Sequence, residues 1–102
     1  MSVITVTKDN FDDVVIKSEK PVLLDFWAPW CGPCRMMSKV IDEIAEDAVD
    51  FVVGKVNVDE EQELAQQFGV MSIPSLFVLK NGEITARSLG AKPKAQVLEM
   101  LK

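Results

Sequence analysis

Apolar and polar positions change their period several times along the chain, and each change marks a predicted element. Runs of strand length, apolar or alternating, occupy 3–6, 21–27 and 51–58. Apolar residues at helical spacing predict helices over 11–18, 34–48 and 93–101. The first two thirds of the chain therefore alternate between strands and helices.

The segment after residue 58 predicts one more helix and a hairpin. Asp59 followed by Gln62 indicates a capped helix start, and Gly69 indicates the helix end. Asn81-Gly82 between two β runs predicts a tight hairpin turn. The predicted order is β-α-β-α-β-α-β-β-α, an α/β fold with a central mixed sheet flanked by helices. Its strand–helix–strand units predict parallel pairing, and the closing hairpin adds one antiparallel pair.

Composition and charge narrow the class of protein. A chain of 102 residues is long enough for one core, so 1–102 is expected to be a single domain. The net charge is −5 and no Lys/Arg cluster is present, so no nucleic-acid or membrane partner is expected. The N-terminus lacks the apolar region of a secretory signal, and no apolar run approaches the ~18 residues that span a bilayer. No large apolar stripe is evident, so a monomer is expected.

The two cysteines of the chain, Cys31 and Cys34, both stand in the segment WCGPC, and three chemistries use that spacing. As a staple, the disulfide would close a very short loop and contribute only about 2 kcal/mol. As metal ligands, the pair lacks partners, because a zinc site takes four ligands and the chain has no histidine and no further cysteine; only a site completed by carboxylates or shared between two copies of the chain remains. The third chemistry is a catalytic dithiol that forms and breaks a disulfide. Without a secretory signal a reducing compartment is expected, where disulfides are more often catalytic than structural, and the cytoplasm is the expected location.

Redox chemistry fits the position of the pair best. The pair joins an apolar strand to an amphipathic helix, with Pro33 near the first helical position, where a missing N–H costs nothing. Cys31 is therefore predicted at the helix N-terminus, where free N–H groups and the helix dipole favour a thiolate. Cys34, one turn later, is expected to be more buried and able to attack a mixed disulfide at Cys31.

Asp25 is a candidate proton carrier. In a strand it shares a face with Leu23 and Trp27, so its carboxyl is expected to be desolvated and its pKa raised. A carboxyl of this kind, shortly before Cys31, suits proton exchange with the Cys34 thiol. The alternative is an ordinary carboxylate at the strand end that reaches solvent.

Several segments together resemble the thioredoxin family: DFWAPWCGPC followed by RMM, then SIPS, KNGE and LGA. The resemblance covers essentially the whole chain and implies the thioredoxin fold and a general protein disulfide reductase. In such an enzyme Cys31 would attack the client disulfide and Cys34 would resolve it. A thioredoxin reductase would restore the dithiol with electrons ultimately from NADPH. The partners would be that reductase and disulfide-containing client proteins, and no cofactor or metal would be needed beside the Cys31–Cys34 pair.

The resemblance also implies roles for residues outside the pair. It favours the catalytic role of Asp25 and places Lys55 near that carboxyl, where the ammonium would partly offset desolvation; a snorkelling lysine is the alternative. It implies a cis bond before Pro74, against the base rate for X–Pro, so that the backbone of Ile73 can pair with an extended client. Gly90 is equally explained as a turn glycine. The implied client-docking rim comprises Trp30, Gly32, Pro33, Ile73, Pro74, Gly90 and Ala91.

Two positions depart from the pattern of bacterial thioredoxins. Lys39 stands where a proline is common in the CxxC helix, so a straighter helix is expected, and Ser75 stands where threonine is usual. Two other functions compete with the reductase. A thioredoxin-like oxidase or isomerase is disfavoured by the Gly-Pro dipeptide, and a non-redox binding module would keep its docking after both cysteines are replaced with serine.

Overall fold

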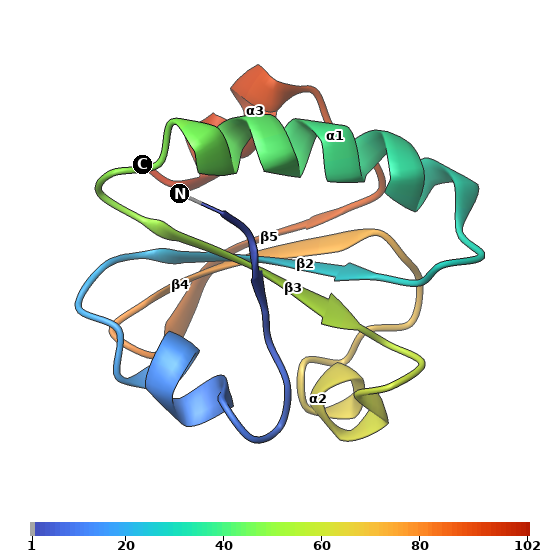
Figure 1. Cartoon of the computed structure of the whole chain (residues 1–102), viewed down its shortest axis with the longest axis horizontal. Helices are drawn as coiled ribbons and strands as arrows, with labels where there is room; N and C mark the ends of the chain where they lie inside the picture. Colours follow the sequence, from blue (N-terminus) through green and yellow to red (C-terminus); the bar gives the residue numbers. More distant parts are fainter. Residues whose placement is uncertain (1) are drawn as a thin grey trace.

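A five-stranded sheet of order β1-β3-β2-β4-β5 runs through the centre of the molecule (Figure 1). The structure is a computed structural model and describes residues 2–102. Its elements are, in chain order, β1 (Ile4–Thr5), the π-helical turn η1 (Asp12–Ile16), β2 (Val22–Trp27), α1 (Gly32–Glu46), β3 (Val52–Asn57), α2 (Gln62–Gln67), β4 (Ser75–Lys80), β5 (Glu83–Leu89) and α3 (Lys94–Met100). The predicted α/β order is confirmed, with boundaries that differ by a few residues.

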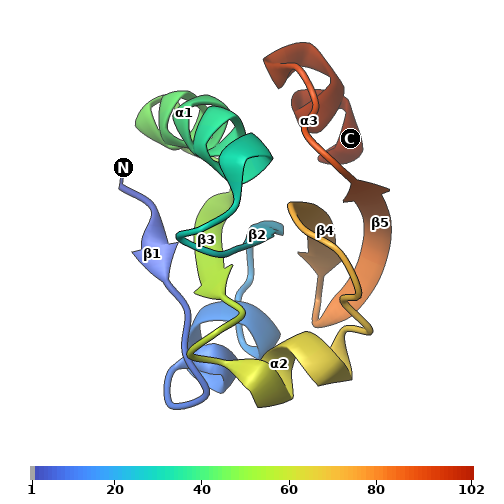
Figure 2. The same cartoon turned by 90° about the vertical axis from the view of Figure 1, so that its right-hand side faces the viewer.

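Helices cover both faces of the sheet, with α1 and α3 on one face and η1 and α2 on the other (Figure 2). The central strand β2 supplies side chains to both layers by simple alternation. Leu23 packs in the core under α1 and α3, whereas Leu24 and Phe26 pack in the core on the other face. Burial on both faces explains why the sequence of this strand is almost continuously apolar.

The hairpin turn and the long helix agree with their sequence signals. Asn81 and Gly82 have φ values of 53° and 78°, the left-handed conformation that a tight β-hairpin turn requires. Helix α1 passes Lys39 without a break.

Within residues 2–102, no helix has the length and apolar character needed to cross a membrane.

The expectation of only one antiparallel pair is wrong. β1 and β2 are both parallel to β3, but β4 is antiparallel to β2 as well as to β5. The reason lies in α2, which at 6 residues has a length of only about 9 Å. It remains at the sheet end where β3 finishes (Figure 1), and it is too short to carry the chain back along the sheet. A parallel crossover needs that return, so β4 starts at the same end and runs in the opposite direction.

The start of α2 also differs from its prediction. Asp59 does not cap the helix: the N-cap is Glu61, without a side-chain hydrogen bond. Instead, the side chain of Asn57 accepts hydrogen bonds from the backbone N–H groups of Asp59 and Glu60, which forms a turn before the helix. The predicted helix end is confirmed, since Gly69 follows the C-cap with a φ of 66°.

Gly54 marks a close approach between the chain segments of the sheet. A Cβ at this position would lie 2.7 Å from Val6 Cγ2 and 3.1 Å from Leu24 Cδ2. Gly54→Ala is therefore expected to lower the free energy of unfolding by about 1–3 kcal/mol, because buried side chains must shift to admit the methyl group. Urea unfolding measures this loss. Gly32→Ala is the matched control, because nothing lies within 4 Å of a Cβ there. Equal stabilities of the two variants would contradict the packing.

Candidate active site

Cys31 and Cys34 lie where β2 leads into α1, and they are joined by a disulfide. Cys31 is the N-cap of α1, and its Sγ accepts a hydrogen bond of 3.2 Å from the backbone N–H of Cys34. The predicted position at the helix N-terminus is confirmed. Cys34 is 2% exposed and Cys31 is 5% exposed, so the order of burial is also as predicted. In the reduced protein, the same N–H group and the helix dipole favour a Cys31 thiolate.

Asp25 is buried in the middle of the sheet, with only 3% of its surface exposed. Burial raises the pKa of Asp25 to about 7; the ammonium of Lys55 lowers this pKa, and Asp42 raises it further. Among residues 2–102, no group donates a hydrogen bond to its Oδ1. The predicted desolvation is confirmed, and the carboxyl can gain or lose a proton near neutral pH.

Lys55 lies opposite Asp25 in the register of β2 and β3. Its Nζ is 5.5 Å from the ring centroid of Trp27, a cation–π distance, and the residue is half-buried. This contact places the ammonium over the indole ring, and its charge lowers the pKa of Asp25. The indole Nε1 of Trp27 is buried without a hydrogen-bond partner among the described residues. Strand β2 thus carries two buried polar atoms without hydrogen-bond partners among the described residues, Oδ1 of Asp25 and Nε1 of Trp27.

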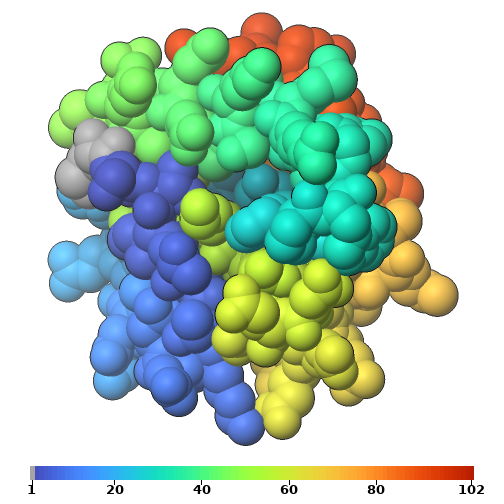
Figure 3. Space-filling view, turned by 45° about the vertical axis from the view of Figure 1, so that its right-hand side comes forward, coloured from blue at the N-terminus to red at the C-terminus, as the bar shows by residue number. Residues whose placement is uncertain are grey.

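A hollow of about 590 Å³ opens beside Cys31. In its lining, the carbonyl oxygen of Ile73 lies 3.9 Å from Cys31 Sγ. The Ile73–Pro74 peptide bond is cis, as the resemblance implied. In Figure 3 the segment with the cysteines (teal) lies against the segment after β3 (yellow), and residues near 70–75 (orange) border both. The lining consists of Trp30, Cys31, Gly32, Pro33, Val58, Val70, Met71, Ser72 and Ile73.

Trp30 forms an exposed wall of this hollow, with 68% of its surface accessible. Its Nε1 donates a hydrogen bond of 3.0 Å to Oδ2 of Asp59, which orients the indole. The exposure of Trp30 agrees with the prediction. The contact with Asp59 was missed, because the linear pattern assigned that carboxylate to a helix cap.

The predicted rim residues do not all meet at this hollow. Gly90 has a φ of 86° and donates its N–H to the carbonyl oxygen of Pro74 at 2.8 Å, so a turn role is directly visible. Ala91 lines a separate hollow together with Met36 and Pro93. The first hollow instead includes four residues that were not predicted for the rim: Val58, Val70 and Met71, which carry no motif, and Ser72, the first residue of SIPS.

Fold and site together define a protein whose paired cysteines are positioned for dithiol/disulfide exchange. Residues 2–102 match the family model described as Thioredoxin. The chain is 46% identical over 100 residues to "Thioredoxin" of Haemophilus influenzae, with 97% of this chain and 94% of that one covered. It is 51% identical over 94 residues to "Thioredoxin" of Alicyclobacillus acidocaldarius, with coverage of 91% and 89%. For "Thioredoxin 1" of Synechococcus elongatus the identity is 48% over 97 residues, with coverage of 94% and 91%.

The chain therefore belongs to the thioredoxin family, and its fold is the thioredoxin fold. Membership implies protein-disulfide oxidoreductase activity, with client disulfides and a thioredoxin reductase as the general partners. The redox group is the cysteine pair itself, since thioredoxins carry no cofactor. Within residues 2–102, no cluster of three or more His, Cys, Asp or Glu side chains is placed to hold a metal ion.

Proposed function

We propose that the protein is a general disulfide reductase in which Cys31 is the attacking thiol and Cys34 the resolving thiol. The observation that carries this assignment is the capping position of Cys31 beside the open hollow, with Cys34 buried one turn further along α1. A thiolate needs both N–H stabilisation and access to its client, and only Cys31 has both.

The reaction follows from these positions in two exchanges. The Cys31 thiolate attacks one sulfur of the client disulfide, the client S–S bond breaks, and the other client sulfur leaves as a thiolate that takes up a proton. Cys34 then loses its proton and attacks the sulfur of Cys31. This forms the Cys31–Cys34 disulfide and releases the second client thiol, so two electrons pass from the protein to the client.

Asp25 is proposed to exchange the proton of Cys34. A carboxyl with a pKa of about 7 can accept a proton from a thiol near neutral pH and return it in the reverse direction. Lys55 has an auxiliary role, because its ammonium limits how far desolvation raises the pKa of Asp25.

Client docking is proposed on the rim of the hollow, where the backbone of Ile73 faces Cys31 and is available to an extended segment. The proposed contact residues are Trp30, Gly32, Pro33, Ile73, Pro74, Gly90 and Ala91. We further propose that 1–102 acts as a single domain and a monomer in the cytoplasm. There it would carry electrons from NADPH through a thioredoxin reductase to client proteins, without nucleic-acid or membrane partners.

The equilibrium potential of the Cys31–Cys34 pair tests the direction of this chemistry. The pair is expected to equilibrate at the reducing end of dithiol and glutathione buffers, where thioredoxins are known to lie at about −270 mV. A value between about −180 and −120 mV would instead identify an isomerase or an oxidant. The potential therefore separates a reductase from a thioredoxin-like oxidase or isomerase, and the measurement needs no particular client.

A further inference from the structure

A second hollow adjoins the one beside Cys31. Its volume is about 390 Å³, and it shares Val70, Met71 and Ser72 with the first. The rest of its lining comes from the segment after α2 and from β4 and β5, and includes Phe77 and Arg87. A chain segment that crosses the 70–72 loop from the cysteines therefore enters this second hollow.

Arg87 gives the second hollow its charge. The guanidinium carbon lies 5.2 Å from the centroid of the Phe77 ring, so the planar group rests on the aromatic face at the hollow. Within residues 2–102, none of the ion pairs or side-chain hydrogen bonds involves Arg87. Ser72 is part of the same lining, and a serine hydroxyl can also donate hydrogen bonds.

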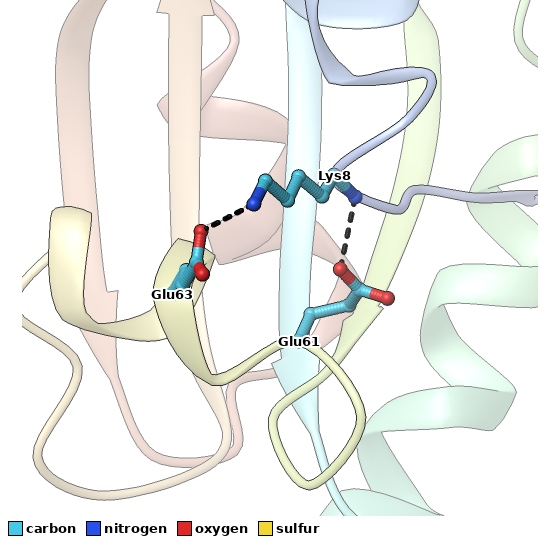
Figure 4. Close-up of polar contacts among 3 residues, drawn as sticks. All are labelled: Lys8, Glu61 and Glu63. Atoms are coloured by element: carbon cyan, nitrogen blue, oxygen red, sulfur yellow. Dashed lines mark hydrogen bonds and ion pairs between the residues drawn. The ribbon is translucent and has the colours of Figure 1, made fainter.

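The surface beside Trp30 is negatively charged. Asp59 accepts the hydrogen bond of the Trp30 indole there, and further carboxylates follow Asp59 along the chain. Lys8 is already engaged by two of them (Figure 4): its backbone N–H donates to Glu61 at 2.9 Å, and its Nζ lies 2.9 Å from Glu63. A client carboxylate is therefore repelled on this side and attracted on the side of Arg87.

We propose that the second hollow is a subsite for a client carboxylate, with Arg87 as the specificity-determining residue. The occupant is an Asp or Glu side chain in the client segment that carries the disulfide, because a guanidinium donates two parallel hydrogen bonds to a carboxylate. The inference rests on the proposed reductase function and defines its preferred substrate class. It adds no chemical step to the exchange at Cys31.

Disulfide-bonded synthetic peptides test the subsite. They differ only in one residue, Glu, Gln or Lys, placed on either side of the reactive cysteine, and kcat/KM for their reduction is measured. The wild-type protein is expected to prefer Glu over Lys by about threefold to tenfold at low salt in one of the two placements, as for a solvent-accessible charge pair. The preference should disappear in Arg87→Gln, reverse in Arg87→Glu, and fade at about 1 M salt, where the screening length is about 3 Å.

Lys80→Glu is the matched control, because it makes the same change in net charge as Arg87→Glu. Lys80 is the last residue of β4, whereas the second hollow is lined by Ser75, the first residue of that strand. It should keep the wild-type ratio between Glu and Lys peptides. An unchanged ratio in Arg87→Glu, or an equal change in Lys80→Glu, would overturn the subsite. The Gln peptide reports the underlying function separately: if wild-type protein fails to reduce it, the reductase proposal fails and the subsite fails with it.

Discussion

Replacing Cys31 with serine is expected to lower the rate of client disulfide reduction by at least about a thousandfold. The serine hydroxyl stays protonated near neutral pH even at the start of α1, so no nucleophile forms at the mouth of the hollow. The rate is measured with a disulfide-bonded peptide and a chemical reductant that regenerates the protein. Substantial turnover by Cys31→Ser would show that Cys31 is not the attacking thiol.

Cys34→Ser is expected to fail at a different step. Cys31 still attacks, but nothing resolves the mixed disulfide, so a covalent adduct with the client accumulates and disappears on treatment with dithiothreitol. Mass spectrometry of the intact protein detects this adduct. Adduct formation by Cys31→Ser instead would reverse the assigned roles. The binding-module alternative predicts two results together: the wild-type protein reduces no client, and a variant with both Cys31 and Cys34 replaced by serine binds clients as tightly as the wild type.

The free energy of unfolding is expected to fall as the pH rises from about 4 to about 8, because of Asp25. Burial raises its pKa from 3.8 to about 7 in the folded protein. Below pH 3.8 the carboxyl is neutral in both folded and unfolded states, and it has no effect. Between the two values the unfolded state has lost the proton and the folded state has not, so stability declines with pH. Above about pH 7 the decline is complete, and the gap between 3.8 and about 7 corresponds to about 4 kcal/mol.

Urea unfolding of the wild type and of Asp25→Asn at pH 4 and pH 8 measures this effect. The variant is expected to be a few kcal/mol more stable than the wild type at pH 8 and almost equal to it at pH 4, because asparagine never carries the buried charge. Asp50→Asn, at an exposed position, is the control and should follow the wild type at both values. The same difference at both pH values would mean that the charge of Asp25 is not its cause.

The parts of the fold that sequence predicts well are those whose signal is local. The continuous apolar run of β2 reflects burial on both faces, and the φ values of Asn81 and Gly82 are accessible to few other residue pairs. The capping position of Cys31 is local in the same sense, because it depends on the strand before it and on Pro33 after it. The apolar strand and Pro33 were enough to place the cysteine pair at the start of a helix.

The remaining features depend on where distant segments meet. The direction of β4 follows from the length of α2 and from the sheet end at which the chain emerges, which periodicity does not report. The hydrogen bond between Trp30 and Asp59 joins residues 29 positions apart. Asp59 looked like a helix cap because that motif is defined by neighbours in sequence. Likewise, the stacking of Arg87 on Phe77 requires the register of β4 with β5.

The Cys31 sulfur both caps α1 and takes part in the redox reaction, so folding of the helix start and reduction of the disulfide are thermodynamically linked. The difference between the potentials of the folded and unfolded chains must equal the difference in unfolding free energy between the oxidised and reduced forms. For this two-electron couple, about 30 mV corresponds to about 1.4 kcal/mol. An influence that frays the first turn of α1 more in one redox form than in the other therefore changes the reducing power of the protein. The potential is a property of the whole fold, and substitutions far from the cysteines can tune it.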